Sequence, residues 1–255
     1  MILRAIDLAI GYPGRTVGAG FTLTLRAGEV IALLGPNGSG KTTLLKTLLG
    51  LLPARGGQVE LDGRPLASFT SGERARWLAY VPQAPGAGFG FTVRESVLMG
   101  RTAHGGLFSG PSSHDRALVD AAIERMGIAA LADQPTTRIS GGERQLALIA
   151  RALAQQARVV VLDEPTANLD FGNQGKVMRE IRRLADEGLG VLFTTHDPNH
   201  ALRFADAALL IRDGRPLASG PVSAVIDGPQ LQALYGSPVL ALRDPLSGAQ
   251  AFLPT

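Results

Sequence analysis

The sequence predicts an α/β fold with a mostly parallel β-sheet, an antiparallel β subdomain at the N-terminus and an inserted α-helical subdomain. The first sign is the uninterrupted apolar run Val159–Leu162, which is typical of a central parallel strand covered on both faces. The second is the alternation of such strands with helical patterns, which implies right-handed βαβ crossovers. The third is the alternation of apolar and polar residues over 2–11 and 21–26, typical of half-exposed antiparallel strands.

Short apolar runs and helix-forming stretches mark the other elements. We expect further strands at 30–34, 58–61, 77–81, 190–195 and 207–211. We expect helices over about 41–51, 171–187 and 198–204, and helical patterns dominate from about 92 to 156 apart from a loop at 104–113. The composition of 84–91, which is rich in Gly and Ala, predicts a mobile connection before this helical block.

These elements predict a chain in three parts. Residues 1–84 and 157–220 would form an α/β core together with its antiparallel subdomain. Residues 85–156 would form the helical subdomain, inserted into that core. Residues 221–255 are punctuated by Pro and Gly and would form a C-terminal appendage.

The composition excludes several classes of function. The chain has 255 residues, 45% of them hydrophobic and 18% charged, which is enough for a sizeable core. Basic residues do not cluster with aromatic ones, so nucleic-acid binding is not predicted. The lack of cysteine excludes disulfides, zinc–thiolate sites and iron–sulfur clusters. No apolar run approaches the ~20 residues of a membrane span, and the N-terminus lacks a signal peptide's layout. We therefore expect a cytoplasmic protein that reaches a membrane only through partners.

A glycine-rich loop between a predicted strand and a predicted helix is the strongest functional motif. Residues 35–42, Gly-Pro-Asn-Gly-Ser-Gly-Lys-Thr, match the phosphate-loop pattern G-x-x-x-x-G-K-[ST] in its required context. The backbone N–H groups of such a loop surround phosphate oxygens, and the following helix directs its positive dipole end at them. Lys41 would contact the β- and γ-phosphates, and the Thr42 hydroxyl would coordinate Mg²⁺. The alternative is an ordinary glycine turn.

Two carboxylates follow the buried strand Val159–Leu162. Ligands of open α/β sheets bind at the carboxyl ends of the strands, so Asp163 and Glu164 should face the phosphate loop. Asp163 would hold Mg²⁺, directly or through water. Glu164 would orient the attacking water or accept its proton. The alternative is a strand-end turn with two solvated charges.

A second helix start could also bind an anion. Ser140, Gly141, Gly142 and Glu143 precede the helical stretch 144–156, so Ser140 would cap a helix whose first N–H groups are exposed by glycines. Taken alone, these residues predict a plain helix cap. A second phosphate-binding helix end makes sense if it serves a nucleotide held by another subunit.

Three single residues are weaker candidates. His196 follows the strand at 190–195 and could contact the γ-phosphate, although a lone histidine is usually structural or merely exposed. Gln83 ends the strand at 77–81 and could reach Mg²⁺ or water, or simply cap backbone groups. Tyr12 could stack on an adenine, or be an ordinary surface tyrosine in a turn.

Taken together, the motifs resemble the ATP-binding subunit of ABC transporters over nearly the whole chain. They stand in that family's order: Walker A at Gly35–Thr43, the Q-loop at Gln83, the signature at Ile139–Glu143, Walker B at Val159–Glu164, the D-loop at Ala167–Asp170 and the switch histidine at His196. The signature is the most diagnostic, because many unrelated ATPases share Walker A and B. It departs from the family's Leu-Ser-Gly-Gly-Gln at Ile139 and Glu143, while Ser140 and both glycines are present.

The resemblance implies that two copies of the chain pair head to tail and bind ATP and Mg²⁺ between them. Each ATP would lie between the phosphate loop of one chain and Ser140–Gly142 of the other, with Asp170 at the dimer interface. The implied ATP-binding residues are Tyr12, Gly35, Pro36, Asn37, Gly38, Ser39, Gly40, Lys41, Thr42 and Thr43, with Ser140, Gly141, Gly142 and Glu143 contributed in trans. The implied Mg²⁺ ligands are Thr42, Gln83 and Asp163, and the implied catalytic residues are Glu164, His196 and Gln83.

The resemblance also implies the partners. The helical block would dock a membrane permease, which places the chain on the cytoplasmic face of the inner membrane, and a solute-binding protein would act indirectly. Four stretches look like importers of metal chelates, such as iron-siderophores, haem or cobalamin, and their relatives that import molybdate: residues 98–101, 106–108, 169–174 and 233–236. Two alternatives stay open, an exporter's ATPase and a soluble ABC ATPase that clamps DNA or ribosomes.

Overall fold

The computed structural model describes residues 2–83, 90–105, 110–167, 169–246 and 248–255. The chain divides into two compact units, one formed by residues 1–68 and 178–255 and the other by residues 69–177. The division falls within helix α6 (Phe171–Asp186). The phosphate loop and His196 therefore belong to the first unit, whereas Gln83, Ser140 and the two strand-end carboxylates belong to the second.

A mainly parallel sheet carries the phosphate loop in the first unit. Strand β3 (Val30–Leu34) pairs in parallel with β8 (Gly190–Thr195) and β9 (Ala207–Arg212), and β10 (Arg215–Pro221) pairs antiparallel with β9. Every residue of β3 and β8 is buried, which explains the apolar sequence of β3 and the apolar centre of β8 at Val191–Phe193. The predicted parallel sheet is confirmed here, and β10 is an additional strand.

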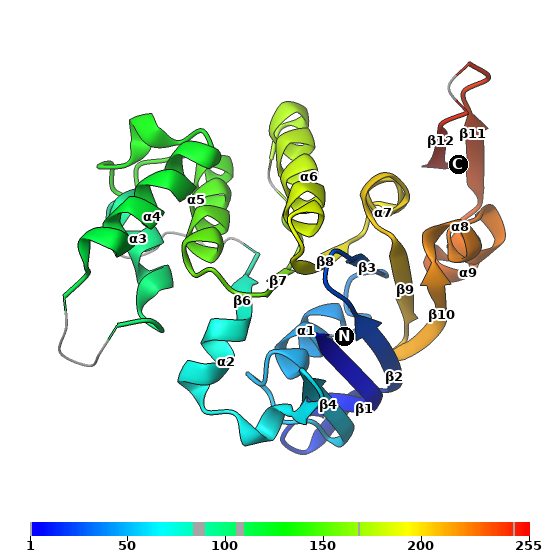
Figure 1. The fold of residues 1–255 in the computed structure, drawn as a ribbon. Helices are drawn as coiled ribbons and strands as arrows, with labels where there is room; N and C mark the ends of the chain where they lie inside the picture. The colour runs from blue at the N-terminus through cyan, green and yellow to red at the C-terminus, as the bar shows by residue number, and fades with distance from the viewer. Residues whose placement is uncertain (1, 84–89, 106–109, 168, 247) are drawn as a thin grey trace. The chain divides into compact units, whose positions relative to one another are not determined.

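An antiparallel sheet forms the N-terminal part of the same unit. Strand β1 (Leu3–Tyr12) pairs with β2 (Arg15–Leu25) and with β4 (Gly56–Leu61), and β4 pairs with the short β5 (Arg64–Pro65). These strands carry the blue and cyan colours in Figure 1. The alternating sequence pattern thus correctly predicted antiparallel pairing, because one face of the sheet is buried and the other is not.

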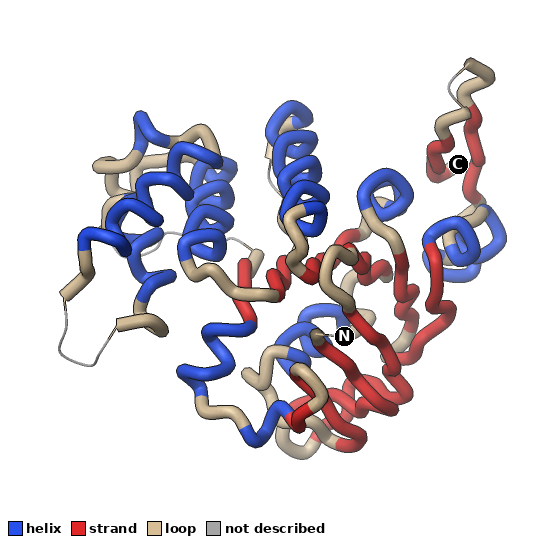
Figure 2. Tube along the Cα trace, viewed as in Figure 1, coloured by secondary structure: helices blue, strands red, loops and turns tan. Residues whose placement is uncertain are grey.

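Helices and a hairpin complete the first unit. The helical elements are α1 (Lys41–Leu48), a 3₁₀ turn at Leu66–Ser68, α7 (Pro198–Phe204), α8 (Val222–Val225) and α9 (Gly228–Tyr235). The chain ends in an antiparallel hairpin of β11 (Val239–Arg243) and β12 (Gln250–Pro254), drawn as red strands at the C-terminus in Figure 2. The stretch predicted only as an appendage is therefore regularly structured.

The second unit combines a parallel strand pair with a group of helices. Strands β6 (Leu78–Val81) and β7 (Val159–Leu162) pair in parallel, with Leu78 opposite Val159 and Val81 opposite Leu162. The helical elements are α2 (Ser71–Trp77), α3 (Val93–Leu98), α4 (Ser113–Arg125), α5 (Gly141–Ala154) and the 3₁₀ turns Met99–Arg101 and Ala129–Leu131. Helices α3, α4 and α5 pack on one another and form the green group in Figure 1.

The helices predicted between residues 92 and 156 are confirmed, whereas some of the other predictions fall on residues that the structure does not describe. Most of the predicted mobile connection, residues 84–89, lies outside the described residues, as do residues 106–109 and Asn168. Among the helices that the structure does describe, none is long and apolar enough to cross a lipid bilayer.

Candidate functional site

The phosphate loop joins β3 to α1 and is shaped by close backbone contacts. A Cβ atom on Gly35 would lie 2.3 Å from the Ile211 carbonyl oxygen, so only glycine fits at the start of the loop. Gly40 precedes α1 with φ of 103°, a left-handed conformation that other residues rarely adopt. The Lys41 ammonium donates to the carbonyl oxygens of Gly35 (2.7 Å) and Pro36 (3.0 Å), which holds it over the loop.

The amino end of α1 lacks a side-chain cap, as does that of the four-residue helix α8. Helices α4, α5 and α9 each begin with a side chain that accepts a hydrogen bond from a first-turn N–H group, whereas α1 has no side-chain cap. The Ser39 hydroxyl is buried and has no hydrogen-bond partner in the part of the chain that the structure describes. Because buried polar groups are normally satisfied, an uncapped helix end beside an unpaired hydroxyl fits an anionic ligand such as a phosphate chain.

His196 lies at the same sheet edge as the phosphate loop. In the parallel pairing of β3 with β8, Leu34 is opposite Thr195, so Gly35 and His196 leave adjacent strands at the same level. The His196 side chain is exposed. The first unit therefore brings together two of the predicted site residues, Lys41 and His196, at the carboxyl edge where ligands of α/β sheets bind.

The second unit brings Gln83 and Asp163 to the ends of neighbouring strands. Val81 is opposite Leu162, and the Asp163 N–H donates to the Val81 carbonyl oxygen (2.8 Å). Asp163 is only 4% exposed, whereas Gln83 is exposed. Glu164 has φ of 46°, in the left-handed region, and its side chain is half-buried. Such strained backbone on a residue other than glycine is concentrated at functional sites.

Tyr80 is a neighbour of Asp163 that sequence reasoning missed. Its hydroxyl donates to the Asp163 Oδ2 atom at 3.5 Å. Burial and, next, the charge of Asp163 raise the pKa of Tyr80 to about 12, so the hydroxyl stays a donor. Pairing the predicted strands 77–81 and 159–162 in parallel would have revealed this contact, because it places both residues near the same strand ends.

The predicted signature forms the start of α5. The Ser140 hydroxyl accepts from the Glu143 N–H (3.2 Å), and the Glu143 carboxylate accepts from the Ser140 N–H (2.8 Å). This reciprocal pair is a capping box, which also begins α2, α3 and α4. Gly141 is exposed, and nothing lies within 4 Å of the Cβ it lacks. The fold itself thus does not require glycine at this position.

Tyr12 and Asp170 occupy element ends. Tyr12 is the last residue of β1 and is 42% exposed. Asp170 precedes α6, and its carboxylate accepts from the backbone N–H and the side-chain amide of Asn173, both at 2.8 Å. Asp170 therefore holds the first turn of α6, whatever else it contacts.

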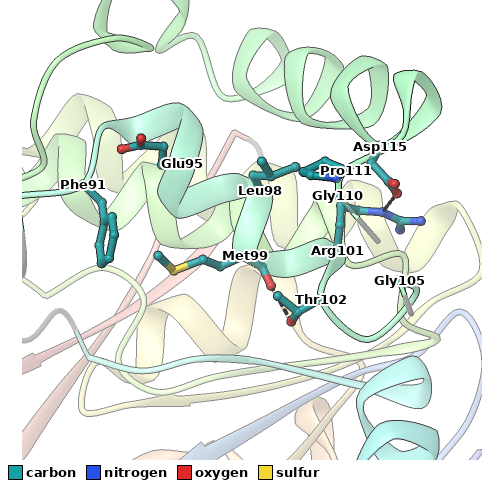
Figure 3. Close-up of a pocket in the computed structure, with 10 residues that line it drawn as sticks. All are labelled: Phe91, Glu95, Leu98, Met99, Arg101, Thr102, Gly105, Gly110, Pro111 and Asp115. Carbon is teal, nitrogen blue, oxygen red and sulfur yellow. Dashed lines mark hydrogen bonds and ion pairs between the residues drawn. The ribbon is translucent and has the colours of Figure 1, made fainter. Parts of the chain in front are cut away.

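A pocket opens between the helices of the second unit (Figure 3). Its volume is ≈ 570 Å³, and its apolar lining includes Phe91, Leu98 and Met99, of which Phe91 and Met99 are exposed. One wall is fixed by Arg101, whose Nε atom lies 2.8 Å from Asp115 Oδ1, as the dashed line in Figure 3 marks. We refer to this feature as the helical-unit pocket.

A glycine loop between a buried parallel strand and an uncapped helix defines a phosphate-loop nucleotide-binding protein. The sequence profile described as "ABC transporter" matches residues 19–167. The chain is 40% identical to the hemin import ATP-binding protein HmuV of Rhodococcus jostii, over 99% of this chain and 86% of that protein. It is 37% identical to the cobalamin import ATP-binding protein BtuD of Halobacterium salinarum, over 100% of this chain and 64% of that protein.

A solved structure agrees with these relatives. A metal-chelate type ABC transporter in an inward-facing conformation has a chain that matches 100% of this chain, over 97% of its own length, with 32% identity and a TM-score of 0.88. The chain therefore belongs to the ABC transporter family, as an ATP-binding subunit that hydrolyses ATP. The resemblance and the fold class predicted from the sequence are both confirmed.

Proposed function

We propose that the chain powers the import of a metal chelate, of the haem, cobalamin or siderophore type, through a membrane permease. The supporting observation is that its likeness to a metal-chelate type transporter and to a hemin import subunit extends over the whole chain, including the C-terminal segment that the family profile does not cover. Molybdate-type oxyanions remain within the proposed cargo class. The chain would lie on the cytoplasmic face of the membrane, held there by the permease.

The first unit would bind the phosphates of ATP. The positions of Lys41 and Ser39 support this, because the ammonium is held over the loop and the hydroxyl is buried without a partner in the described residues. The remaining loop residues would donate their N–H groups to phosphate oxygens. Tyr12 would stack on the adenine, and its 42% exposure leaves the ring accessible. His196 would contact the γ-phosphate.

The second unit would supply the hydrolytic groups. Asp163 and Gln83 of this unit would offer a carboxylate and an amide oxygen, and Thr42 of the first unit would offer its hydroxyl, which are ligand types that Mg²⁺ prefers. Glu164 would accept the proton of the attacking water, and its strained backbone is consistent with a fixed orientation.

Two copies would pair head to tail, each covering the other's ATP with the start of α5. Gly141 supports this arrangement, because the fold leaves open space at its missing Cβ and so does not itself require glycine there. A partner's phosphate groups could approach the backbone closely at such a position. Asp170 would lie at the dimer interface, at the first turn of α6.

The helical-unit pocket, with its exposed Phe91 and Met99, would receive an element of the permease.

Reconstitution with the permease tests the proposed function. The subunit and its permease would be placed in lipid vesicles and supplied with hemin, cobalamin, a ferric siderophore or molybdate, together with the solute-binding protein. We expect ATP-dependent uptake of one metal chelate or oxyanion. The Glu164→Gln variant should bind ATP but lose turnover by about 10²–10⁴-fold, the usual contribution of a general base, and should abolish uptake. Outward transport, or co-purification with ribosomes and no membrane protein, would overturn the proposal.

A further inference from the structure

The loop that follows β8 is attached to the C-terminal segment by a tyrosine. Tyr235, the last residue of α9, donates its hydroxyl hydrogen to the His196 carbonyl oxygen at 2.9 Å. The ring is partly buried, and burial followed by the charge of Asp197 raises the pKa of Tyr235. The hydroxyl therefore remains protonated, and able to donate, at any physiological pH.

A second attachment lies three residues further on. The Asn199 side chain donates to the Phe252 carbonyl oxygen (3.0 Å) and accepts from the Phe252 N–H (2.8 Å). The amide thus pairs with strand β12 as a neighbouring strand's backbone would. Phe252 is 6% exposed, so this end of the hairpin is anchored in the first unit.

Further hydrogen bonds join neighbouring residues of the loop between these attachments. The Asp197 N–H donates to the Thr195 hydroxyl (3.0 Å), and the Asp197 carboxylate accepts from the Asn199 N–H (2.8 Å), which caps α7. A displacement at either attachment would therefore move the backbone of residues 195–199 as one piece. His196 lies within this segment, directly after Thr195 at the end of β8. The direction of its ring therefore depends on the backbone of residues 195–199.

The loop and the hairpin also line a pocket of ≈ 480 Å³, to which His196, Asp197, Leu231, Tyr235, Pro238 and Phe252 contribute among others. The two hydrogen-bonded attachments therefore join the loop to α9 and β12 beside an open space, where packing contacts are fewer than in a filled core.

We infer that Tyr235 and Asn199 are positioning residues for ATP hydrolysis, through which α9 and the C-terminal hairpin fix the His196 loop. This inference rests on the proposed contact of His196 with the γ-phosphate. It assigns the C-terminal segment a part in the ATPase reaction, since that segment holds the backbone from which the His196 ring projects.

Tyr235→Phe tests the first attachment, because it removes one hydroxyl and keeps the ring. We expect kcat for ATP hydrolysis to fall about three- to tenfold, as the loss of one hydrogen bond predicts, with the Kd for ATP unchanged. Asn199→Ala should lower kcat in the same way. Leu240→Ala, on the exposed face of β11 and outside the pocket, is the matched control and should leave kcat unchanged. An unchanged kcat in both attachment variants would overturn the inference.

Histidine NMR separates positioning from a general loss of stability. The chain has four histidines, and the His196 signal can be assigned with His196→Gln. We expect Tyr235→Phe to shift or broaden the ring signal of His196 and to leave those of His104 and His114 in place. An unmoved His196 signal would contradict the inference even if kcat fell. Near-normal turnover of His196→Gln would instead remove the proposed role of His196, and the NMR result would still report on the attachment.

Discussion

Gly35, the first residue of the phosphate loop, has almost no free space around its Cα atom. A Cβ there would lie 2.3 Å from the Ile211 carbonyl oxygen and 2.7 Å from the Ser39 hydroxyl. Backbone cannot move aside cheaply, so Gly35→Ala should displace the loop from β9. We expect a loss of about 1–3 kcal/mol in the free energy of unfolding, typical of overpacking. We also expect at least an order of magnitude in ATP affinity to be lost, measured by calorimetry.

Gly72 provides the control for this change. It lies in α2, has an ordinary φ, and has nothing within 4 Å of its missing Cβ. Gly72→Ala should leave ATP affinity unchanged and raise stability by up to about 1 kcal/mol, since alanine favours helix. Equal behaviour of the two variants would contradict the close-contact explanation for Gly35.

The raised pKa of Tyr80 should make the free energy of unfolding depend on pH in the alkaline range. This pKa is raised from 10 to about 12, first by burial and then by Asp163. Between these values the unfolded chain loses the proton and the folded chain keeps it, so stability is full below pH 10 and falls as pH rises towards 12. In Tyr80→Phe this part of the loss is absent. We expect the urea midpoint of the variant to fall less between pH 8 and pH 11 than that of the parent, with Tyr12→Phe as the exposed control.

Sequence patterns predicted single site residues wherever the chemistry is contained in one contiguous motif. The phosphate loop, Asp163 and Glu164 are of this kind, because strand, turn and functional side chain follow one another. The sequence did not predict which residues contact the site from elsewhere in the chain, namely Tyr80, Tyr235 and Asn199. Their contacts join positions 83, 39 and 53 residues apart, so no local pattern contains them.

At the scale of elements, the strands that are buried along their whole length were the easiest to predict. The bounds expected for β3, β7 and β8 are those observed, because each strand is followed directly by Gly, Asp or His. Helix α7 was equally clear, since Asp197 caps it and Pro198 begins it. Strand β10 and the β11–β12 hairpin were missed, because their residues are mainly exposed and so carry no strong apolar pattern.

The helices of the second unit are joined by one buried arginine. Arg101 is 7% exposed and contacts Asp115 at the start of α4, the Ala154 carbonyl oxygen at the end of α5 (2.9 Å) and Gln156 Oε1 (3.2 Å). Arg101→Ala leaves the buried Ala154 carbonyl without this donor. We expect a loss on the order of 1–3 kcal/mol in denaturant unfolding. Arg101→Lys should recover little, because one ammonium cannot reproduce the planar guanidinium's contacts.

Arg116, the exposed neighbour of Asp115, supplies the control for Arg101. Arg116→Ala removes the same charge from the surface of α4 and should change stability by no more than about 0.5 kcal/mol.

The hydroxyl of Ser112 and the guanidinium of Arg101 hold the pKa of Asp115 well below its usual range. The stability from this carboxylate is therefore present above about pH 4 and is lost as pH falls further. The stability difference between Arg101→Ala and the parent should shrink in acid, and a constant difference would contradict the pairing.

For the whole molecule, the proposed head-to-tail dimer predicts that two inactive variants rescue each other. Lys41→Ala lacks the phosphate-loop ammonium, and Ser140→Arg places a bulky side chain where the partner's ATP would contact α5. A mixed pair would contain one intact site, formed by Lys41 of one chain and Ser140 of the other. In a Glu164→Gln background, which preserves ATP, we expect dimers from the mixture and none from either variant alone, as measured by gel filtration.

The control for this complementation separates the contact with a partner from the loss of a helix cap. Ser140→Arg also removes the capping box of α5, at a typical cost of about 1 kcal/mol. Thr70 begins α2 with the same reciprocal bonds to Glu73, outside the proposed interface, so Thr70→Arg removes an equivalent cap. We expect Thr70→Arg to dimerise with ATP as the parent does. If Thr70→Arg also failed to dimerise, cap loss would explain both variants, and Ser140 would need no partner.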